Sequence, residues 1–121
     1  MLQTISIEGM EFYAYHGVMP QENQTGNRFT VDITVWTDFT LAAQTDTLEG
    51  TINYADLYQI TAQAMQKPAK LLENLAYQII QQIFERFPKA EKAKVTIYKH
   101  NPPVAGLARW SKITLKQKRS S

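Results

Sequence analysis

The chain has 121 residues, the size of a single small domain, and it contains no cysteine, which excludes a disulfide framework and a thiolate metal site or nucleophile. The formal net charge is +2, and because Lys116, Lys118 and Arg119 lie together at the end of the chain, the body is close to neutral. A neutral body argues against a nucleic-acid partner, since affinity for phosphate backbones needs clustered basic residues.

The chain begins with a predicted strand. Residues 3–8 and 10–15 alternate polar and apolar side chains, and we expect one strand that is broken or bulged near Gly9. This beginning lacks the basic region and apolar block of a secretion signal, and no run of residues is long enough for a membrane helix. We therefore expect a cytoplasmic protein without a membrane partner.

A second strand is predicted over residues 28–37, with its apolar side chains on one face. These side chains are Phe29, Val31, Ile33 and Val35. The polar segment between the two strands contains His16 and Glu22 and is much longer than a hairpin needs. Its length favours a functional role for this segment.

Two helices follow in the predicted order. The first begins after Asn53, a suitable N-cap, with Asp56 in its first turn. The second runs from about Lys70 to Phe87 and ends before Pro88. Its apolar stripe consists of Leu72, Leu75, Ala76, Ile79 and Ile83.

Two final strands are predicted over residues 92–99 and 108–116, which gives the element order ββααββ. This order predicts an α+β fold in which both helices pack on one face of a four-stranded antiparallel sheet. We expect residues 1–118 to form one domain and residues 119–121 to form a frayed, basic and polar tail.

Lys99 gives the clearest chemical signal in the sequence. It ends a row of apolar side chains, Ala93, Val95 and Ile97, because alternate residues of a strand share a face. A lysine in this place must be ion-paired or partly neutral, and burial lowers the pKa of a lysine toward the range of a general base. From periodicity alone, a lysine at a strand end that reaches solvent is the more common case.

Other candidate residues have ordinary structural interpretations. Glu73, in the first turn of the second helix, is placed to stabilise the helix dipole. Glu22 can be an exposed loop carboxylate, and Tyr54 can pack the start of the first helix against the core. His16 is typical of a structural loop position, and we assign it no catalytic role. With His100 as the second of two histidines, the sequence offers too few ligands for a zinc site.

Four segments of the chain match one known family in order and spacing. They are F-Y-A-Y-H-G-V at 12–18 followed by Glu22, T-I-N-Y at 51–54, L-L-E-N-L-A at 71–76, and V-T-I-Y-K at 95–99. Together they resemble the dihydroneopterin aldolase family over nearly the whole chain. The resemblance implies the tunnelling fold, in which subunit sheets close into a ring-shaped β-barrel. It also implies that ring tetramers stack in pairs as octamers, with active sites between adjacent subunits.

The same resemblance implies a role for each candidate residue. Glu73, assisted by the backbone of Leu72, is expected to bind the pterin ring of a small-molecule substrate. Glu22 is expected to contact the hydroxyls of the substrate side chain. Lys99 is implied as the catalytic general base and acid, and Tyr54 of the neighbouring subunit as a substrate-binding residue that assists proton transfer. No cofactor and no metal is implied.

The implied activity is that of a carbon–carbon lyase of folate biosynthesis, which cleaves 7,8-dihydroneopterin into 6-hydroxymethyl-7,8-dihydropterin and glycolaldehyde. Epimerisation at C2′ is an implied side activity. Two alternatives stay open: a dihydroneopterin triphosphate epimerase of the same fold, and a non-catalytic assembly module. The chain departs from the usual K-P-x-A-P at residues 99–103, where it has K-H-N-P-P, and the loss of a proline at position 100 removes a backbone constraint beside Lys99.

Overall fold

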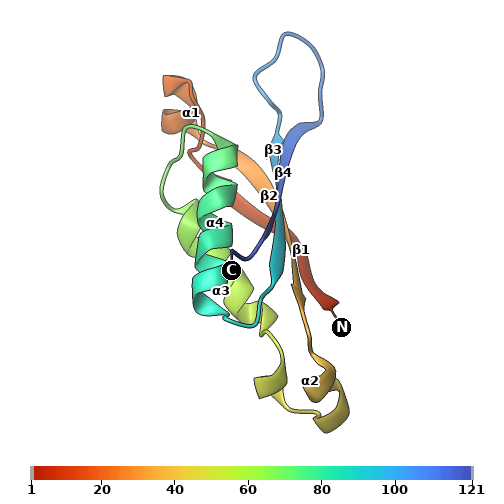
Figure 1. The fold of residues 1–121 in the computed structure, drawn as a ribbon. Helices are drawn as coiled ribbons and strands as arrows, with labels where there is room; N and C mark the ends of the chain where they lie inside the picture. The colour runs from red at the N-terminus through yellow and green to blue at the C-terminus, as the bar shows by residue number, and fades with distance from the viewer. Residues whose placement is uncertain (1, 121) are drawn as a thin grey trace.

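An antiparallel sheet forms the centre of the molecule. The computed structural model describes residues 2–120, and its strands are β1 (Gln3–Ala14), β2 (Asn27–Thr37), β3 (Lys92–His100) and β4 (Trp110–Lys118). Each strand pairs with the next along the chain, so that the order in the sheet is β1-β2-β3-β4 (Figure 1). The predicted α+β fold with a four-stranded antiparallel sheet is confirmed.

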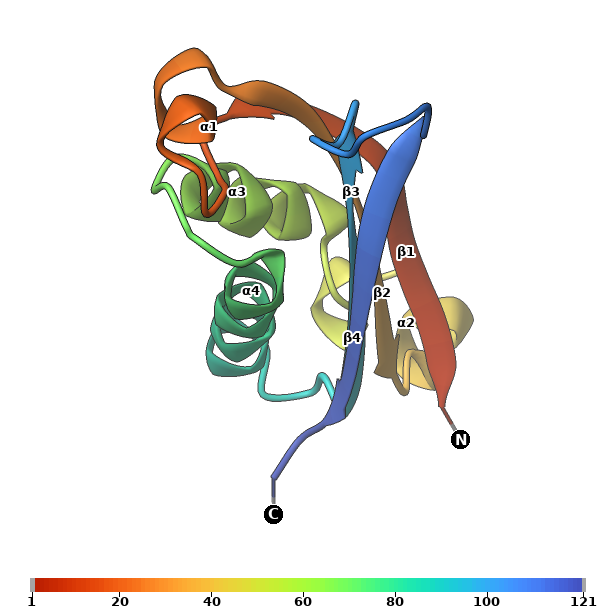
Figure 2. The ribbon, with the colours of Figure 1, turned by 90° about the horizontal axis from the view of Figure 1, so that it is seen from above.

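The two main helices, α3 (Tyr54–Met65) and α4 (Leu72–Arg86), lie on the same face of the sheet (Figure 2). They cover the alternate residues of β2 and β3 that the sequence pattern assigns to one face. These residues are fully buried: Phe29, Val31, Ile33, Val35, Ala93, Val95 and Ile97. The middle of the sheet therefore carries the hydrophobic core, as predicted. Within residues 2–120, no helix is long and apolar enough to cross a membrane.

Three short helical segments were not predicted. They are α1 (Pro20–Thr25), α2 (Thr40–Thr45) and the 3-10 helix η1 (Leu48–Gly50). The predicted order ββααββ is correct for the long elements and omits these segments. Neither α1 nor α2 buries an apolar side chain in the core, so no apolar periodicity marks them in the sequence.

β1 contains the irregularity that was predicted near Gly9. The pairing of β1 with β2 shifts between Ile7 and Met10. Gly9 has a φ of +70°, a backbone conformation that glycine adopts without steric cost, and its N–H donates to Asp32 Oδ1 at 2.7 Å. The bulge lets β1 pair with β2 over its whole length.

Both main helices begin near the predicted residues. The side chain of Asn53 accepts a hydrogen bond from the Ala55 N–H at 2.9 Å and is therefore the N-cap of α3. Asp56, in the first turn of α3, forms an ion pair of 3.0 Å with Arg86, the last residue of α4. This contact joins the start of one helix to the end of the other.

The expectation of a frayed end is wrong for Arg119. Its guanidinium donates to the carbonyl oxygens of Phe84 at 2.9 Å, Phe87 at 2.6 Å and Ala90 at 2.7 Å. It also lies 4.8 Å from the ring centroid of Phe84. A helix end leaves several carbonyls without intrahelical partners, and a guanidinium can bind more than one of them. Arg119 thus caps the end of α4.

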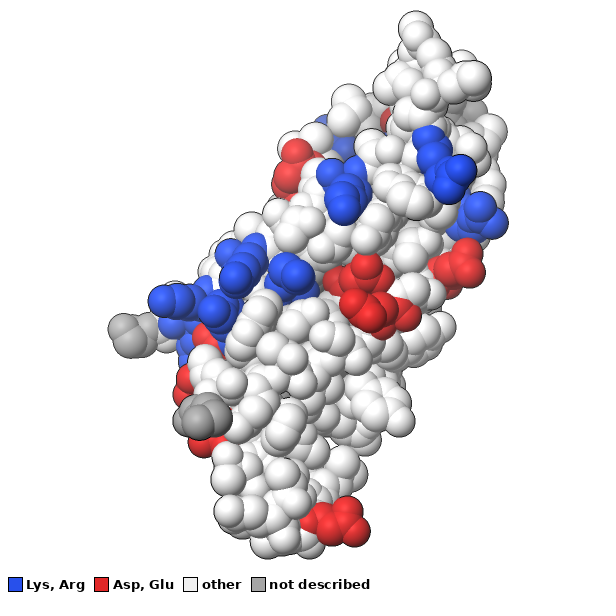
Figure 3. Space-filling view, turned by 90° about the vertical axis from the view of Figure 1, so that its right-hand side faces the viewer, with Lys and Arg blue, Asp and Glu red and all other residues white. Residues whose placement is uncertain are grey.

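Lysines gather on the face of the sheet that carries no helix (Figure 3). In the register of β3 and β4, Lys92 lies opposite Lys118 and Lys94 lies opposite Lys116. The ammonium groups of Lys92 and Lys116 lie 4.8 and 5.2 Å from the ring centroid of Trp36. Lys116 and Lys118 both belong to β4.

Candidate active site

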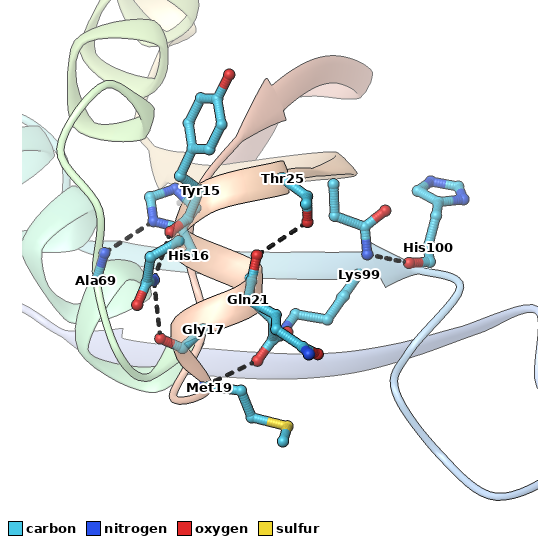
Figure 4. A network of polar contacts seen from close by, with 12 residues as sticks. Tyr15, His16, Gly17, Met19, Gln21, Thr25, Ala69, Lys99 and His100 are labelled. Carbon is cyan, nitrogen blue, oxygen red and sulfur yellow. Dashed lines mark hydrogen bonds and ion pairs between the residues drawn. The ribbon is translucent and has the colours of Figure 1, made fainter.

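Lys99 and Glu22 form an ion pair at one end of the sheet. The distance from Lys99 Nζ to Glu22 Oε2 is 2.6 Å, and the two side chains are only 12% and 15% exposed. Lys99 extends from β3 toward α1, which carries Glu22 (Figure 4). The alternatives of a solvent-reaching lysine and an exposed loop carboxylate are both wrong, because each residue shields the charge of the other.

The environment of Glu22 favours its ionised form. Burial by itself would raise the pKa of Glu22. The hydrogen bond from Lys99, the backbone N–H of Met19 and the positive charge of Lys99 act in the opposite direction, and the net result is a lowered pKa. Glu22 therefore carries its negative charge in this contact.

The loop before α1 is shaped around the carboxylate of Glu22. Pro20 occupies the first turn of α1, and the Met19 N–H donates to Glu22 Oε1 at 3.3 Å. A Cβ at Gly17 would lie 2.4 Å from the carboxyl carbon of Glu22, and Gly17 has a φ of +151°. Only glycine leaves room for the carboxylate at this place.

His16 and Gly17 fasten this loop to the segment before α4. The Ala69 N–H donates to His16 Nδ1 at 2.9 Å, and the Gly17 N–H donates to the Ala69 carbonyl at 2.9 Å. The side chain of Asn23, in α1, donates to the Gly17 carbonyl at 3.2 Å. The ion-paired end of the sheet is therefore tied to the start of α4.

Glu73 and Leu72 lie at this same end, in the first turn of α4. In Figure 1 the start of α4 lies at the same end of the molecule as α1 and the last residues of β3. Leu72 is largely buried, whereas Glu73 is exposed and its carboxylate has no hydrogen bond or ion pair within residues 2–120. The structure thus brings Glu22, Leu72, Glu73 and Lys99 to one end of the molecule.

Tyr54 is not part of this group within one chain. It is 64% exposed and lines a groove of about 560 Å³ at the other end of the sheet, together with Ile5. Ile5 pairs with Val35, whereas Lys99 pairs with Phe29, so the two places lie about 20 Å apart along β2. The remaining groove residues come mainly from α2 and the segment after it: Phe39, Ala42, Ala43, Asp46, Thr47, Leu48, Thr51, Ile52 and Asn53.

At position 100 the chain has a histidine in place of the family's usual proline. Hydrogen bonds of His100 hold the backbone after Lys99. His100 Nε2 lies 2.7 Å from Thr30 Oγ1, and the His100 carbonyl accepts a hydrogen bond from the side chain of Asn27. His100 also pairs with Trp110 of β4. Sequence reasoning missed the contact with Asn27, because the two residues are 73 positions apart and only the pairing of β2 with β3 brings them together.

Within the described residues, no group of three or more His, Asp or Glu is placed to hold a metal ion.

Comparisons with known proteins identify the family of this chain. The sequence profile of the dihydroneopterin aldolase family matches residues 5–116. The chain belongs to the dihydroneopterin aldolase family. It is 40% identical over 120 residues to the dihydroneopterin aldolase of Bacillus subtilis, covering 98% of this chain and 100% of that protein. It is 38% identical over 107 residues to the dihydroneopterin aldolase of Staphylococcus epidermidis, with 88% of each chain covered.

Solved structures of other family members share the fold. The Escherichia coli dihydroneopterin aldolase, solved in complex with neopterin, matches with a TM-score of 0.87 at 18% identity, covering 95% of this chain and 98% of that chain. A Burkholderia dihydroneopterin aldolase bound to guanine matches with a TM-score of 0.79 at 15% identity, covering 98% and 93%. At these identities the comparison shows that the family fold and the fold of this chain are the same.

Proposed function

We propose that this protein is a dihydroneopterin aldolase that cleaves 7,8-dihydroneopterin into 6-hydroxymethyl-7,8-dihydropterin and glycolaldehyde, with epimerisation at C2′ as a side reaction. The observation that carries the proposal is the shielded Lys99–Glu22 pair at the end of the molecule where α4 starts, in a chain of this family. A lysine held in a partly buried place next to a carboxylate is suited to proton transfer.

The chemistry needs little more than positioning and proton transfer. A base takes the proton of the C2′ hydroxyl, the C1′–C2′ bond breaks, and glycolaldehyde leaves with its new carbonyl group. The electron pair of the broken bond moves into the N5=C6 imine of the substrate and forms an enamine. Protonation of the enamine at C1′ restores the imine and gives the product. The substrate itself is the electron acceptor, so the enzyme requires no Schiff base and no cofactor.

Glu73 and Leu72 bind the pterin ring in this proposal. The 2-amino group and N3–H of a pterin are adjacent donors, and one carboxylate can accept both hydrogen bonds. Glu73 is exposed and its carboxylate has no partner within residues 2–120, so it is available for this contact. The backbone of Leu72 lies one residue away in the same helical turn and assists.

Glu22 and Lys99 act together on the substrate side chain. Their 2.6 Å contact stabilises the charged ammonium, whereas a general base must be neutral. We infer that the substrate hydroxyls take the place of the ammonium group as partners of Glu22. Lys99 is then released to take the C2′ proton and later to return a proton to the enamine.

The active site also requires a residue from a second subunit. Tyr54 shares with Ile5 an apolar groove that is open to solvent, and Ile5 lies about 20 Å along β2 from the Lys99 end of the same chain. β1 and β4 are the edges of the sheet and have unpaired backbone groups on one side. Closing these edges in a ring tetramer, with two rings stacked as an octamer, would place Tyr54 of one subunit beside Lys99 of the next. Light scattering should show the oligomer, and a stable monomer at micromolar concentration would contradict it.

A product assay tests the proposed activity. The protein is incubated with 7,8-dihydroneopterin and the products are separated by chromatography, with the Lys99→Ala variant as the control. We expect 6-hydroxymethyl-7,8-dihydropterin and glycolaldehyde in equal amounts from the wild-type protein. A second incubation, with dihydroneopterin triphosphate, distinguishes the aldolase from a dihydroneopterin triphosphate epimerase of the same fold. Epimerisation of the triphosphate without cleavage of the free substrate would overturn the aldolase assignment.

A further inference from the structure

His16 is a buried side chain that the proposed mechanism does not use. Its exposed fraction is 1%, although it lies in the loop between β1 and α1. Nδ1 accepts the hydrogen bond from the Ala69 N–H at 2.9 Å, so this nitrogen carries no proton. The imidazole is therefore held in the tautomer that carries its proton on Nε2, and Nε2 has no partner within the described residues. A buried polar atom without a hydrogen-bond partner is uncommon and calls for an explanation.

The position of His16 connects it to both halves of the candidate site. Its ring packs edge-on against Phe29, with 5.3 Å between the ring centroids. Lys99 Nζ lies 5.9 Å from the centroid of the same Phe29 ring. On its other side His16 is bonded to Ala69, three residues before the first residue of α4. His16 thus stands between the strand residue that acts on the substrate and the helix start that holds the pterin ring.

The charge state of His16 fits this position. Burial, and to a smaller extent the charge of Lys99, lower the pKa of His16. The imidazole is therefore neutral near pH 7, and only the neutral ring can accept the Ala69 hydrogen bond. A protonated ring would place an N–H against the Ala69 N–H and open the contact.

We propose that His16 is a positioning residue of the active site: its Nδ1 hydrogen bond to Ala69 fixes the start of α4, with Leu72 and Glu73, relative to the Lys99–Glu22 pair. The Gly17 N–H bond to the Ala69 carbonyl completes a two-bond connection between the loop and this segment. The inference rests on the proposed function, in which Glu73 binds the pterin ring and Lys99 acts on the reacting hydroxyl. Glu73 and Lys99 must be held at a fixed distance from each other, because they contact the two ends of one substrate.

Two amide variants separate the acceptor at Nδ1 from the rest of the ring. His16→Asn carries an amide oxygen near the place of Nδ1, whereas His16→Gln carries its amide near the place of Nε2. We expect His16→Asn to keep kcat/KM and neopterin affinity within about threefold of wild type. His16→Gln should lose about 10²-fold in kcat/KM, the size of effect that a displacement of about 1 Å causes. His16→Gln should also bind neopterin more weakly, as measured by calorimetry on the folded protein.

The controls distinguish a failure of this inference from a failure of the proposed function. Glu85→Gln changes an exposed residue in the last turns of α4, away from the candidate site, and should leave kcat/KM unchanged. Thermal unfolding of each variant shows whether a loss follows from instability, which a purely structural role would produce without changing the affinity of the folded fraction. Equal activity of His16→Asn and His16→Gln, or lower activity of His16→Asn, would overturn the inference. An inactive wild-type protein would instead overturn the proposed function.

Discussion

The two ends of the sheet differ in what they contain. At the Lys99 end, opposite charges are shielded from solvent and joined to α1, and the start of α4 is fastened at the same end. At the Tyr54 end, an apolar groove opens to solvent and carries an exposed tyrosine. The first end has a shielded ion pair, and the second has an exposed aromatic side chain in an open groove. The proposed function assigns these two ends to one site that forms between chains.

Removing the lysine should have the largest effect on activity. We expect Lys99→Ala to lower kcat by about 10²–10⁴-fold, the range for a positioned acid–base group. Lys99→Arg should fail almost as badly, because a guanidinium keeps its proton at neutral pH. Steady-state kinetics with 7,8-dihydroneopterin measure both variants. Near wild-type turnover by Lys99→Arg would show that this end needs only a positive charge.

Changing Glu73 should separate binding from chemistry at the same end. Glu73→Gln replaces an anionic acceptor, and loss of a charge-assisted contact costs about 1.5–3 kcal/mol. Calorimetry with neopterin should show a weaker affinity of this size, and Glu85→Gln, an exposed glutamate in the last turns of α4, serves as the control. Unchanged affinity would remove Glu73 from the pterin site.

Breaking the ion pair should reduce stability in a pH-dependent way. Glu22→Gln leaves Lys99 partly buried without a counter-charge, and we expect a loss of about 1–3 kcal/mol in the free energy of unfolding at pH 7. Because folding lowers the pKa of Glu22, its contribution is present above the usual value of 4.5 and is lost as the pH falls through the lowered value. Denaturant unfolding across this range measures it. A difference between wild type and variant that persists at the acid end would contradict this assignment.

The lysines on the helix-free face should have the smallest effect. Lys94 lies opposite Lys116, and like charges at opposed positions destabilise a sheet, so Lys94→Glu should stabilise the chain by about 0.2–1 kcal/mol. Lys67→Glu makes the same charge change in the segment between α3 and α4 and serves as the control. Aldolase activity should not change in either variant. Lower stability of Lys94→Glu would show that the lysines have a partner on this face.

The sequence predicted the parts of the fold that rest on local patterns. The alternation of β2 and β3, the Asn53 cap and the bulge at Gly9 follow from neighbouring residues and could be located in advance. Lys99 was singled out because it continues an apolar row. The resemblance of the chain to its family then assigns Lys99 the role of general base and acid, which periodicity alone does not favour.

The contacts that complete the site could not be read from local patterns. Glu22 and Lys99 are 77 positions apart, and nothing near Glu22 in the sequence shows that its carboxylate is shielded. α1 is six residues long and buries no apolar side chain in the core, so the segment that shapes this carboxylate site lacked a helical signal. Arg119 binds carbonyls that become available only where α4 ends against β3. These features depend on tertiary packing.

A mixing experiment tests most directly whether the two ends belong to one site between chains. Lys99→Ala and Tyr54→Phe are each expected to be nearly inactive alone. In co-expressed mixed oligomers, a site that takes Lys99 from one chain and Tyr54 from its neighbour is intact at about a quarter of interfaces when the chains mix at random. We expect the mixture to recover about that share of wild-type activity. Mixed oligomers that stay as inactive as the separate variants would contradict a site built from both ends of the sheet.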